Sequence, residues 1–201
     1  AAIETTFANP GWVLPHSEKM DMVITPSQHA KNSLTNSGNC STPIHVVPEC
    51  FFEEITGDHL PLPINLSTSF NFLTVGVLTG MTPASDRKNL FYLIKWFIDE
   101  FKNDPDVGLI IKTNRGRETT IDKKGTHLLL EKLLNEVGHT GTPKVYLLHG
   151  QMTRSEMTSL YKDETVKAFL SCTRGEGFGL PHLESAASGL PVIATNWSSH
   201  K

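Results

Sequence analysis

Two carboxylates at a fixed spacing, Glu176 and Glu184, stand in the segment GEGFGLPHLESAASGLPVIAT, which runs from Gly175 to Thr195. A carboxylate accepts two hydrogen bonds from adjacent hydroxyls, so two carboxylates suit a ligand that carries hydroxyls at two places. Taken singly, the same residues also fit an exposed turn acid and an acid favoured by the dipole at a helix N-terminus. The glycine-rich residues between them favour the ligand-binding interpretation.

These intervening residues predict a backbone anion site. Glycines at alternate positions from 175 to 179 allow the backbone to approach a ligand closely. Pro181 is expected as the first helical residue, and the N–H groups of Phe178, Gly179 and Leu180 just before it would suit a diphosphate. A sugar nucleotide offers a diphosphate to the amides, and a ribose and a second sugar to the carboxylates.

An alternation of strands and helices must position this segment. Apolar runs such as Gly108 to Ile111 and Val145 to Leu148 suit strands covered on both faces, whereas apolar residues recur at helical spacing over 90–101. Right-handed crossovers then give a doubly wound parallel α/β sheet of the Rossmann-like kind. The expected strands are 70–78, 107–113, 144–150, 167–173 and 191–196, and the expected helices are 87–102, 121–137, 153–163 and 180–188.

The amino-terminal quarter of the chain predicts a separate unit. A strand over 22–27, a helix over 28–36 with Ser27 as its N-cap, and a strand over 43–48 would form one βαβ unit. Residues 50–69 carry prolines, glycine and acids with little periodicity, as expected of a connector.

The turns after the strands of such a sheet are where ligands bind, beyond the carboxyl ends. Here they are 77–85, 112–117, 150–153 and 173–180. Arg87 and Lys88 are expected to open the helix after the first of them, where a basic side chain can reach a phosphate. Lys112 and Arg115 follow the second strand, but placement on the surface is at least as good an interpretation for them.

Composition excludes several classes of function. With 38% hydrophobic and 19% charged residues the chain is globular, and a net charge of −3 provides no broad basic surface for duplex nucleic acid. No apolar run approaches the ~18 residues that a membrane span requires, and the amino terminus lacks a signal-peptide layout. Cys40, Cys50 and Cys172 are odd in number and widely spaced, which indicates reduced thiols in the cytoplasm.

The quoted segment resembles the E-x7-E signature of retaining GT-B glycosyltransferases of the family 4 type, also called glycosyl transferases group 1. The similarity lies in the donor-binding carboxyl-terminal domain of that family and spans roughly twenty positions. FLTVGVLTGMTPASDRKNL resembles the first strand of that domain, its glycine turn and the following helix. DMVITPSQHAKNSL and IHVVPE resemble the end of the family's amino-terminal, acceptor-binding domain.

The resemblance implies a role for each matching residue. Glu176 would hold the transferred sugar near the reacting carbon, and Glu184 would bind the ribose hydroxyls. Lys88, with Arg87 beside it, would bind the diphosphate, although Val77 stands where many members have an arginine. The implied backbone contacts are Gly177, Phe178, Gly179 and Leu180 for sugar and phosphates, and Gly150, Gln151 and Met152 for the nucleobase.

The resemblance also implies a division of the chain. Residues 1–49 would be the end of the acceptor-side domain, 50–69 the linker, and 70–201 a donor-binding domain cut short at its carboxyl end. The chain is therefore expected to be a fragment of a two-domain enzyme, inactive by itself in acceptor transfer. Any membrane contact would come through the missing domain.

The implied activity is that of a retaining hexosyltransferase, which moves a sugar from a nucleotide sugar to a hydroxyl of a glycan or other acceptor. UDP-, GDP- and ADP-sugars all remain open as donors, and the resemblance implies neither a metal nor another cofactor. Two alternatives remain: a nucleotide-sugar epimerase or phosphorylase of related fold, and a non-catalytic nucleotide-sugar binding module.

Other residues with chemical potential have simpler interpretations. His182 and Glu184 form an H-x-E pair, but the cysteine half of a zinc deaminase motif is absent. His149, at the end of an apolar strand, is expected to be packed or hydrogen-bonded. Trp96 and the neighbouring aromatics, Phe91, Tyr92, Phe97 and Phe101, are expected in the helix core.

Overall fold

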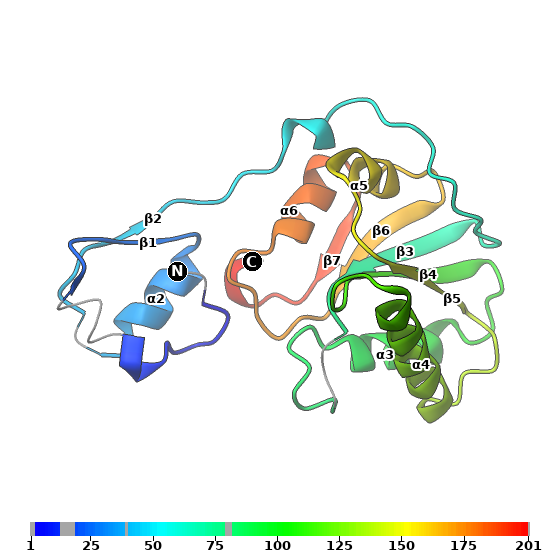
Figure 1. Cartoon of the computed structure of the whole chain (residues 1–201), viewed down its shortest axis with the longest axis horizontal. Coiled ribbons are helices and arrows are strands. Elements are labelled where there is room, and N and C mark those ends of the chain that lie inside the picture. The colour runs from blue at the N-terminus through cyan, green and yellow to red at the C-terminus, as the bar shows by residue number, and fades with distance from the viewer. Residues whose placement is uncertain (1–2, 13–18, 39, 79–81, 201) are drawn as a thin grey trace. The chain divides into compact units, whose positions relative to one another are not determined.

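The computed structural model describes residues 3–12, 19–38, 40–78 and 82–200, and it forms two compact units (Figure 1). Unit 1 comprises 1–51, 174–183 and 195–201, and unit 2 comprises 52–173 and 184–194, in each case within the described residues. The chain thus enters unit 2 twice. The assignment of acceptor-side and donor-binding domains to these parts stays a prediction.

A five-stranded parallel sheet forms the centre of unit 2. Its strands are β3 (Phe70–Val75), β4 (Val107–Thr113), β5 (Lys144–His149), β6 (Val166–Ser171) and β7 (Val192–Ala194), in the order β5-β4-β3-β6-β7. The central strand β3 pairs with β4 on one side and with β6 on the other. This confirms the predicted doubly wound α/β fold.

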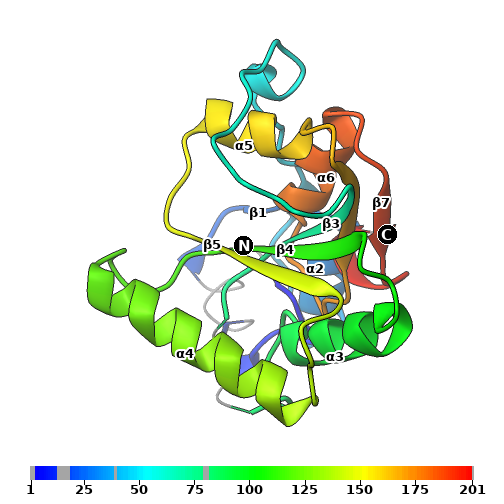
Figure 2. The same cartoon turned by 90° about the vertical axis from the view of Figure 1, so that its right-hand side faces the viewer.

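Helices cover both faces of this sheet (Figure 2). They are α3 (Leu90–Phe101), α4 (Thr120–Glu136), α5 (Arg154–Tyr161) and α6 (Leu180–Ala187), and the boundary between the units falls within α6. On one face α3 and α4 pack over Leu109 and Ile111, and on the other α5 packs over Ile110. Successive β4 residues therefore serve opposite cores, as strand geometry requires. The short helix η1 (Glu53–Ile55) adds Ile55 to the second core.

The start of α3 differs from the prediction. The helix begins at Leu90 rather than Arg87, because the Asp86 carboxylate accepts hydrogen bonds from the N–H groups of Leu90 (2.6 Å) and Phe91 (3.3 Å). Asn89 adopts a left-handed conformation with φ 56° just before the helix. Arg87 and Lys88 therefore lie in the turn before α3, not in its first turn.

The expectation that Trp96 belongs to the helix core is wrong. Its side chain is 53% exposed, and its ring stacks on Tyr92 with 5.6 Å between ring centroids. The buried face of α3 is formed by residues 90, 93, 94, 97 and 98, and position 96 faces away from it. Phe97 is buried, and Phe91 and Phe101 pack against the same core.

Unit 1 contains the predicted βαβ unit. Strands β1 (Val23–Thr25) and β2 (Ile44–Val46) pair in parallel, and α2 (Gln28–Thr35) connects them. Ser27 caps α2, since its hydroxyl accepts a 3.1 Å hydrogen bond from the N–H of Ala30. The helix η2 (Ser198–His200) also belongs to this unit.

Candidate functional site

The order in which the chain adds strands to the sheet of unit 2 reverses at β3. The chain runs from β3 outward to β4 and β5, then crosses back to build β6 and β7 on the other side of β3. In sheets of this kind the loops after the two central strands part, and ligands bind in the crevice between them. Here these strands are β3 and β6, and residues 76–89 and 172–173 follow them within unit 2.

Two hydrogen bonds fix the loop before α3 to the end of β6. The side-chain amide of Asn89 donates to the carbonyl of Cys172 at 3.0 Å. The hydroxyl of Thr173 donates to the carbonyl of Arg87 at 3.4 Å. The turn that carries Arg87 and Lys88 therefore lies at the point where the strand order reverses.

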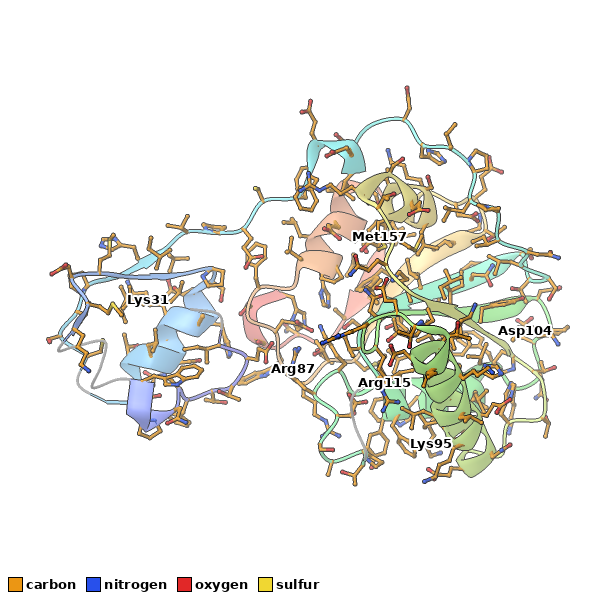
Figure 3. The ribbon with its side chains drawn as sticks, viewed as in Figure 1. Lys31, Arg87, Lys95, Asp104, Arg115 and Met157 are labelled. Carbon is orange, nitrogen blue, oxygen red and sulfur yellow. The ribbon has the colours of Figure 1, made fainter. Side chains whose placement is uncertain are left out.

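Lys88 lies against the glycine that directly follows β3. A Cβ atom placed on Gly76 would be 3.4 Å from Cγ and 3.5 Å from Cδ of Lys88. Both Lys88 and Arg87 are half-buried. Figure 3 shows Arg87 and Arg115 on the side of unit 2 toward which the strands point, with Asp104 on the opposite side. The lysine stem is thus held at the carboxyl end of the central strand.

Glu184 is held in unit 2 by a buried tyrosine. The hydroxyl of Tyr161, at the end of α5, donates a 3.1 Å hydrogen bond to Oε2 of Glu184, and the tyrosine ring is 2% exposed. Burial raises the pKa of Glu184, and the Tyr161 hydrogen bond partly opposes that rise. Burial and the nearby Glu184 charge raise the pKa of Tyr161 in turn. Oε1 of Glu184 accepts no hydrogen bond from the described residues, so it is available to a ligand hydroxyl.

Lys112 is more buried than the sequence interpretation expected. It is the last residue but one of β4 and is 5% exposed, whereas placement on the surface was expected to be at least as good an interpretation. Its ammonium donates hydrogen bonds to Oδ1 of Asn114 at 2.8 Å and to the carbonyl of Gly150. Burial lowers the pKa of Lys112, and the charge of Glu118 opposes this. Arg115, by contrast, is exposed.

The turn predicted to bind the nucleobase follows β5. The N–H of Gly150 donates to the carbonyl of Thr113 at 3.1 Å, and Gly150 has φ 121°, a conformation that favours glycine. Gly150 and Met152 are half-buried, and Gln151 is exposed. His149 is half-buried, and its Nε2 has no hydrogen-bond partner among the described residues. Of the two alternatives expected for it, packing and hydrogen bonding, the structure thus favours packing.

The glycine-rich loop belongs to unit 1, where two serines hold its backbone. Ser198 accepts a 3.0 Å hydrogen bond from the N–H of Glu176 and donates one of 2.8 Å to the carbonyl of the same residue. The hydroxyl of Ser27 donates to the carbonyl of Gly177 at 2.9 Å. Glu176 itself is 6% exposed. The loop is therefore held by contacts from both other segments of unit 1, Ser27 from 1–51 and Ser198 from 195–201.

Two glycines of this loop occupy positions that exclude a side chain. A Cβ atom on Gly175 would lie 2.0 Å from the carbonyl oxygen of Glu4. Gly179 has φ 97°, and a Cβ there would lie 3.0 Å from Cβ of His200. The close backbone approach predicted for these glycines is made to the protein itself.

The amides predicted to form the anion site lie at the start of α6. Among the residues that the structure describes, none accepts a hydrogen bond from the N–H groups of Phe178, Gly179 or Leu180. Leu180 is the first residue of α6, and Pro181 is the second. The ring of His182 stacks on that of His200, with centroids 4.5 Å apart. Within the described ranges, no group of three or more His, Cys, Asp or Glu residues is arranged to hold a metal ion.

Glu176 belongs to unit 1 and Glu184 to unit 2. The expectation that both carboxylates serve one ligand stays a prediction.

Val77 is 39% exposed directly after Gly76. Thr79 to Met81, part of the same predicted turn, lie outside the described residues. Within the described residues, no helix is both long and apolar enough to cross a membrane.

The family model described as glycosyl transferases group 1 matches residues 81–201. That range contains Arg87, Lys88, the turn after β5 and both glutamates. A search of curated protein sequences gave no match.

Solved structures with the same fold include the following three. The pneumococcal O-GlcNAc transferase GtfA, in complex with UDP and GlcNAc, is 17% identical and aligns with 96% of this chain and 34% of its own, with a TM-score of 0.61. Anabaena HepE, in complex with UDP and glucose, is 16% identical over 93% and 47%, with a TM-score of 0.68. A trehalose-6-phosphate synthase studied for glycosyl transfer with retention is 14% identical over 96% and 52%, with a TM-score of 0.65.

These structural similarities support the fold, and an activity has to be argued from the residues of the site. The chain spans 34% to 52% of the length of these three structures. The family match covers more than half of the chain and includes the E-x7-E segment, the basic turn before α3 and the turn after β5. The chain belongs to the glycosyl transferases group 1 family.

Proposed function

We propose that this chain carries the donor-binding part of a glycosyltransferase that moves a sugar from a nucleoside diphosphate sugar to an acceptor hydroxyl, with retention of configuration. The observation that carries the proposal is the family match, which spans the whole segment from Glu176 to Glu184 together with Lys88. Neighbours of the same fold bound to UDP with GlcNAc or glucose support the donor class. The synthase studied for transfer with retention supports the stereochemistry.

Each part of the donor has a partner in this proposal. Lys88, with its stem on Gly76 at the carboxyl end of β3, binds the diphosphate, and Arg87 supplies a second positive charge. Glu184, held by Tyr161, accepts hydrogen bonds from the ribose hydroxyls. The remaining contacts are Glu176 to the transferred sugar, the backbone of Gly177, Phe178, Gly179 and Leu180 to sugar and phosphates, and that of Gly150, Gln151 and Met152 to the nucleobase.

Charge develops on the leaving diphosphate as the sugar–phosphate bond breaks. Lys88, Arg87 and the amides at the start of α6 neutralise that charge, the role that a divalent cation has in other enzymes, so no metal is part of the proposal. The acceptor hydroxyl attacks from the face that the diphosphate leaves, and its proton passes to a phosphate oxygen. Glu176 orients the sugar and forms no bond to it.

The cellular setting of the proposal is the cytoplasm. Cys40, Cys50 and Cys172 are free thiols, as expected in a reducing compartment. The acceptor is proposed to be a hydroxyl of a glycan or another molecule.

The binding part of the proposal is tested by calorimetry of the 201-residue chain with UDP, GDP and ADP. Lys88→Met keeps the stem that packs on Gly76 and removes the charge, and Lys95→Met on the exposed face of α3 is its control. We expect the Kd of the preferred nucleotide to rise about tenfold or more in Lys88→Met, because a charged hydrogen bond contributes roughly 1.5–3 kcal/mol, and to stay unchanged in the control.

A second pair of variants tests the ribose contact. Glu184→Gln keeps an oxygen that can accept the Tyr161 hydrogen bond but loses the charge, and the exposed Glu164→Gln is its control. Weaker binding in Glu184→Gln alone supports the assignment. The assignment of Glu184 to the ribose is wrong if none of the three nucleotides binds, or if both variants bind as tightly as wild type.

The transfer step is tested on a longer protein that contains an acceptor-binding domain. Release of free nucleotide from a nucleotide sugar should rise when the correct sugar acceptor is added, and the product should keep the anomeric configuration of the donor. Conversion of the donor into an isomer without an acceptor would indicate an epimerase instead.

A further inference from the structure

Lys112 is a buried cation whose two hydrogen-bond partners are neutral. Its side chain is 5% exposed, and its ammonium donates to the amide oxygen of Asn114 and to the carbonyl of Gly150. Within the described part of the chain it forms no ion pair. A buried charge is costly unless polar groups satisfy it, and the two hydrogen bonds use only two of the three donors of the ammonium. Its place near the carboxyl end of β4 therefore favours a binding role.

The ammonium lies beside a small cavity at the carboxyl end of β5. The cavity has a volume of about 260 Å³. Apolar walls come from the 62–64 segment and from Leu147 and Leu148, and the remaining lining residues are Lys112, Lys123, His149, Gly150, Met152 and Glu156. Gly150 and Met152 belong to the turn that the proposed function assigns to the nucleobase. Because whole-ligand pockets occupy roughly 300–1,000 Å³, this space suits one ring system rather than a complete nucleotide.

The hydrogen-bonding capacity of the ammonium limits which base can occupy this cavity. An ammonium has three donors and no acceptor. Two of the donors are used by Asn114 and Gly150, which leaves one for a ligand atom in the cavity. The exocyclic group of uracil or guanine, O4 or O6, is a carbonyl oxygen and accepts a hydrogen bond, whereas the exocyclic group of adenine, N6, is an amine and donates one.

Resting on the proposed function, we propose that Lys112 selects a nucleobase with a carbonyl acceptor, so that the donor is a UDP- or GDP-sugar and not an ADP-sugar. With the exocyclic amine of adenine in the place of that carbonyl, the ammonium would face another donor and lose a hydrogen bond in a buried place. The hydrogen bond from the same ammonium to the Gly150 carbonyl would hold the turn in a fixed position relative to the base.

The test is the ratio of dissociation constants for ADP and for the tighter of UDP and GDP. Calorimetry on the wild-type chain should give a ratio of at least about ten, because a buried charged hydrogen bond is lost with adenine. Lys112→Met, which has no donor, and Lys112→Gln, whose amide offers both a donor and an acceptor and therefore suits either exocyclic group, should bring the ratio close to one. Lys123→Met is the control, since Lys123 lines the same cavity from an exposed position and should leave the ratio as in wild type.

The outcomes separate this inference from the function on which it rests. If none of the three nucleotides binds, the proposed function fails and the inference fails with it. If they bind but wild type does not discriminate against ADP, only the role of Lys112 is overturned, and this result needs no variant to fold. A folded Lys112→Gln or Lys112→Met that keeps the wild-type ratio overturns it equally.

Discussion

Replacing Tyr161 with phenylalanine should make nucleotide binding more sensitive to acid. The Tyr161 hydroxyl is buried and donates to Oε2 of Glu184, and this bond stabilises the ionised carboxylate against the effect of burial, which raises its pKa. Tyr161→Phe keeps the ring in the second core and removes only the hydroxyl. The pKa of Glu184 should therefore rise further in the variant.

The size of the effect follows from the hydrogen bond that is lost. A hydrogen bond to a charged group contributes roughly 1.5–3 kcal/mol when buried. Glu184 is half-exposed, so solvent screening reduces this to about 1 kcal/mol. If only the ionised form binds ribose, the variant should bind nucleotide as wild type does at pH 8, and roughly fivefold more weakly at pH values where Glu184 is largely protonated in both proteins.

Stability should change with pH in the corresponding sense. Because the pKa of Glu184 is raised on folding, its contribution to stability is fully present below the pKa of the unfolded chain and is lost as the pH rises through the pKa of the folded state. Tyr161→Phe raises the folded pKa, so its Tm should fall more steeply than that of wild type between acidic and neutral pH.

Calorimetric titrations of UDP and GDP between pH 5 and pH 8 measure the binding effect, and Tyr92→Phe on α3 provides the control. If the ratio of variant to wild-type Kd stays constant over this range, nucleotide binding does not depend on the ionisation of Glu184, and the role assigned to the Tyr161 hydrogen bond is wrong.

Substitutions at three further positions test the packing described above by denaturant unfolding. Gly175→Ala should destabilise the chain by about 1–3 kcal/mol because its Cβ would overlap the Glu4 carbonyl, and an unchanged midpoint would contradict that contact. Gly125→Ala in α4, where a Cβ meets no atom within 4 Å, should instead stabilise it by about 0.5–1 kcal/mol. Asp86→Ala should cost about 1–2 kcal/mol through the lost cap of α3, whereas Asp86→Asn, which keeps an acceptor oxygen, should cost less.

Much of the fold could be predicted because the periodic signals were strong. The apolar run over 107–113 is entirely buried in β4, and the leucine and isoleucine spacing of 90–98 matches the buried face of α3. The glycine and proline positions gave α6 its correct limits to within one residue at each end. These are local patterns that need no tertiary contact to be recognised.

The errors came from side chains whose surroundings depend on distant parts of the chain. The start of α3 was missed because the Asp86 cap and the left-handed Asn89 replace the usual serine or threonine signal. Lys112 was undervalued because lysine is rarely buried, and its partner Gly150 is 38 residues away. A signal was nevertheless available: a lysine directly after four buried apolar residues at a strand's carboxyl end.

The candidate site was predicted only in part for the same reason. The motif identified Glu184 and Lys88, but the partners that hold them, Tyr161 and Gly76, follow from the packing of α5 and from the turn after β3. Pairs that are 23 and 12 residues apart leave no periodic pattern in the sequence.

The central claim is that a nucleoside diphosphate binds at the carboxyl ends of β3 and β5. It is tested most directly by mapping amide shifts of the ¹⁵N-labelled 201-residue chain during titration with UDP and GDP. We expect the largest changes at Gly76, Lys88, Gly150 and Glu184, while Lys95 and Asp104 stay unchanged. Changes confined to other parts of the chain, or none at saturating nucleotide, would contradict it.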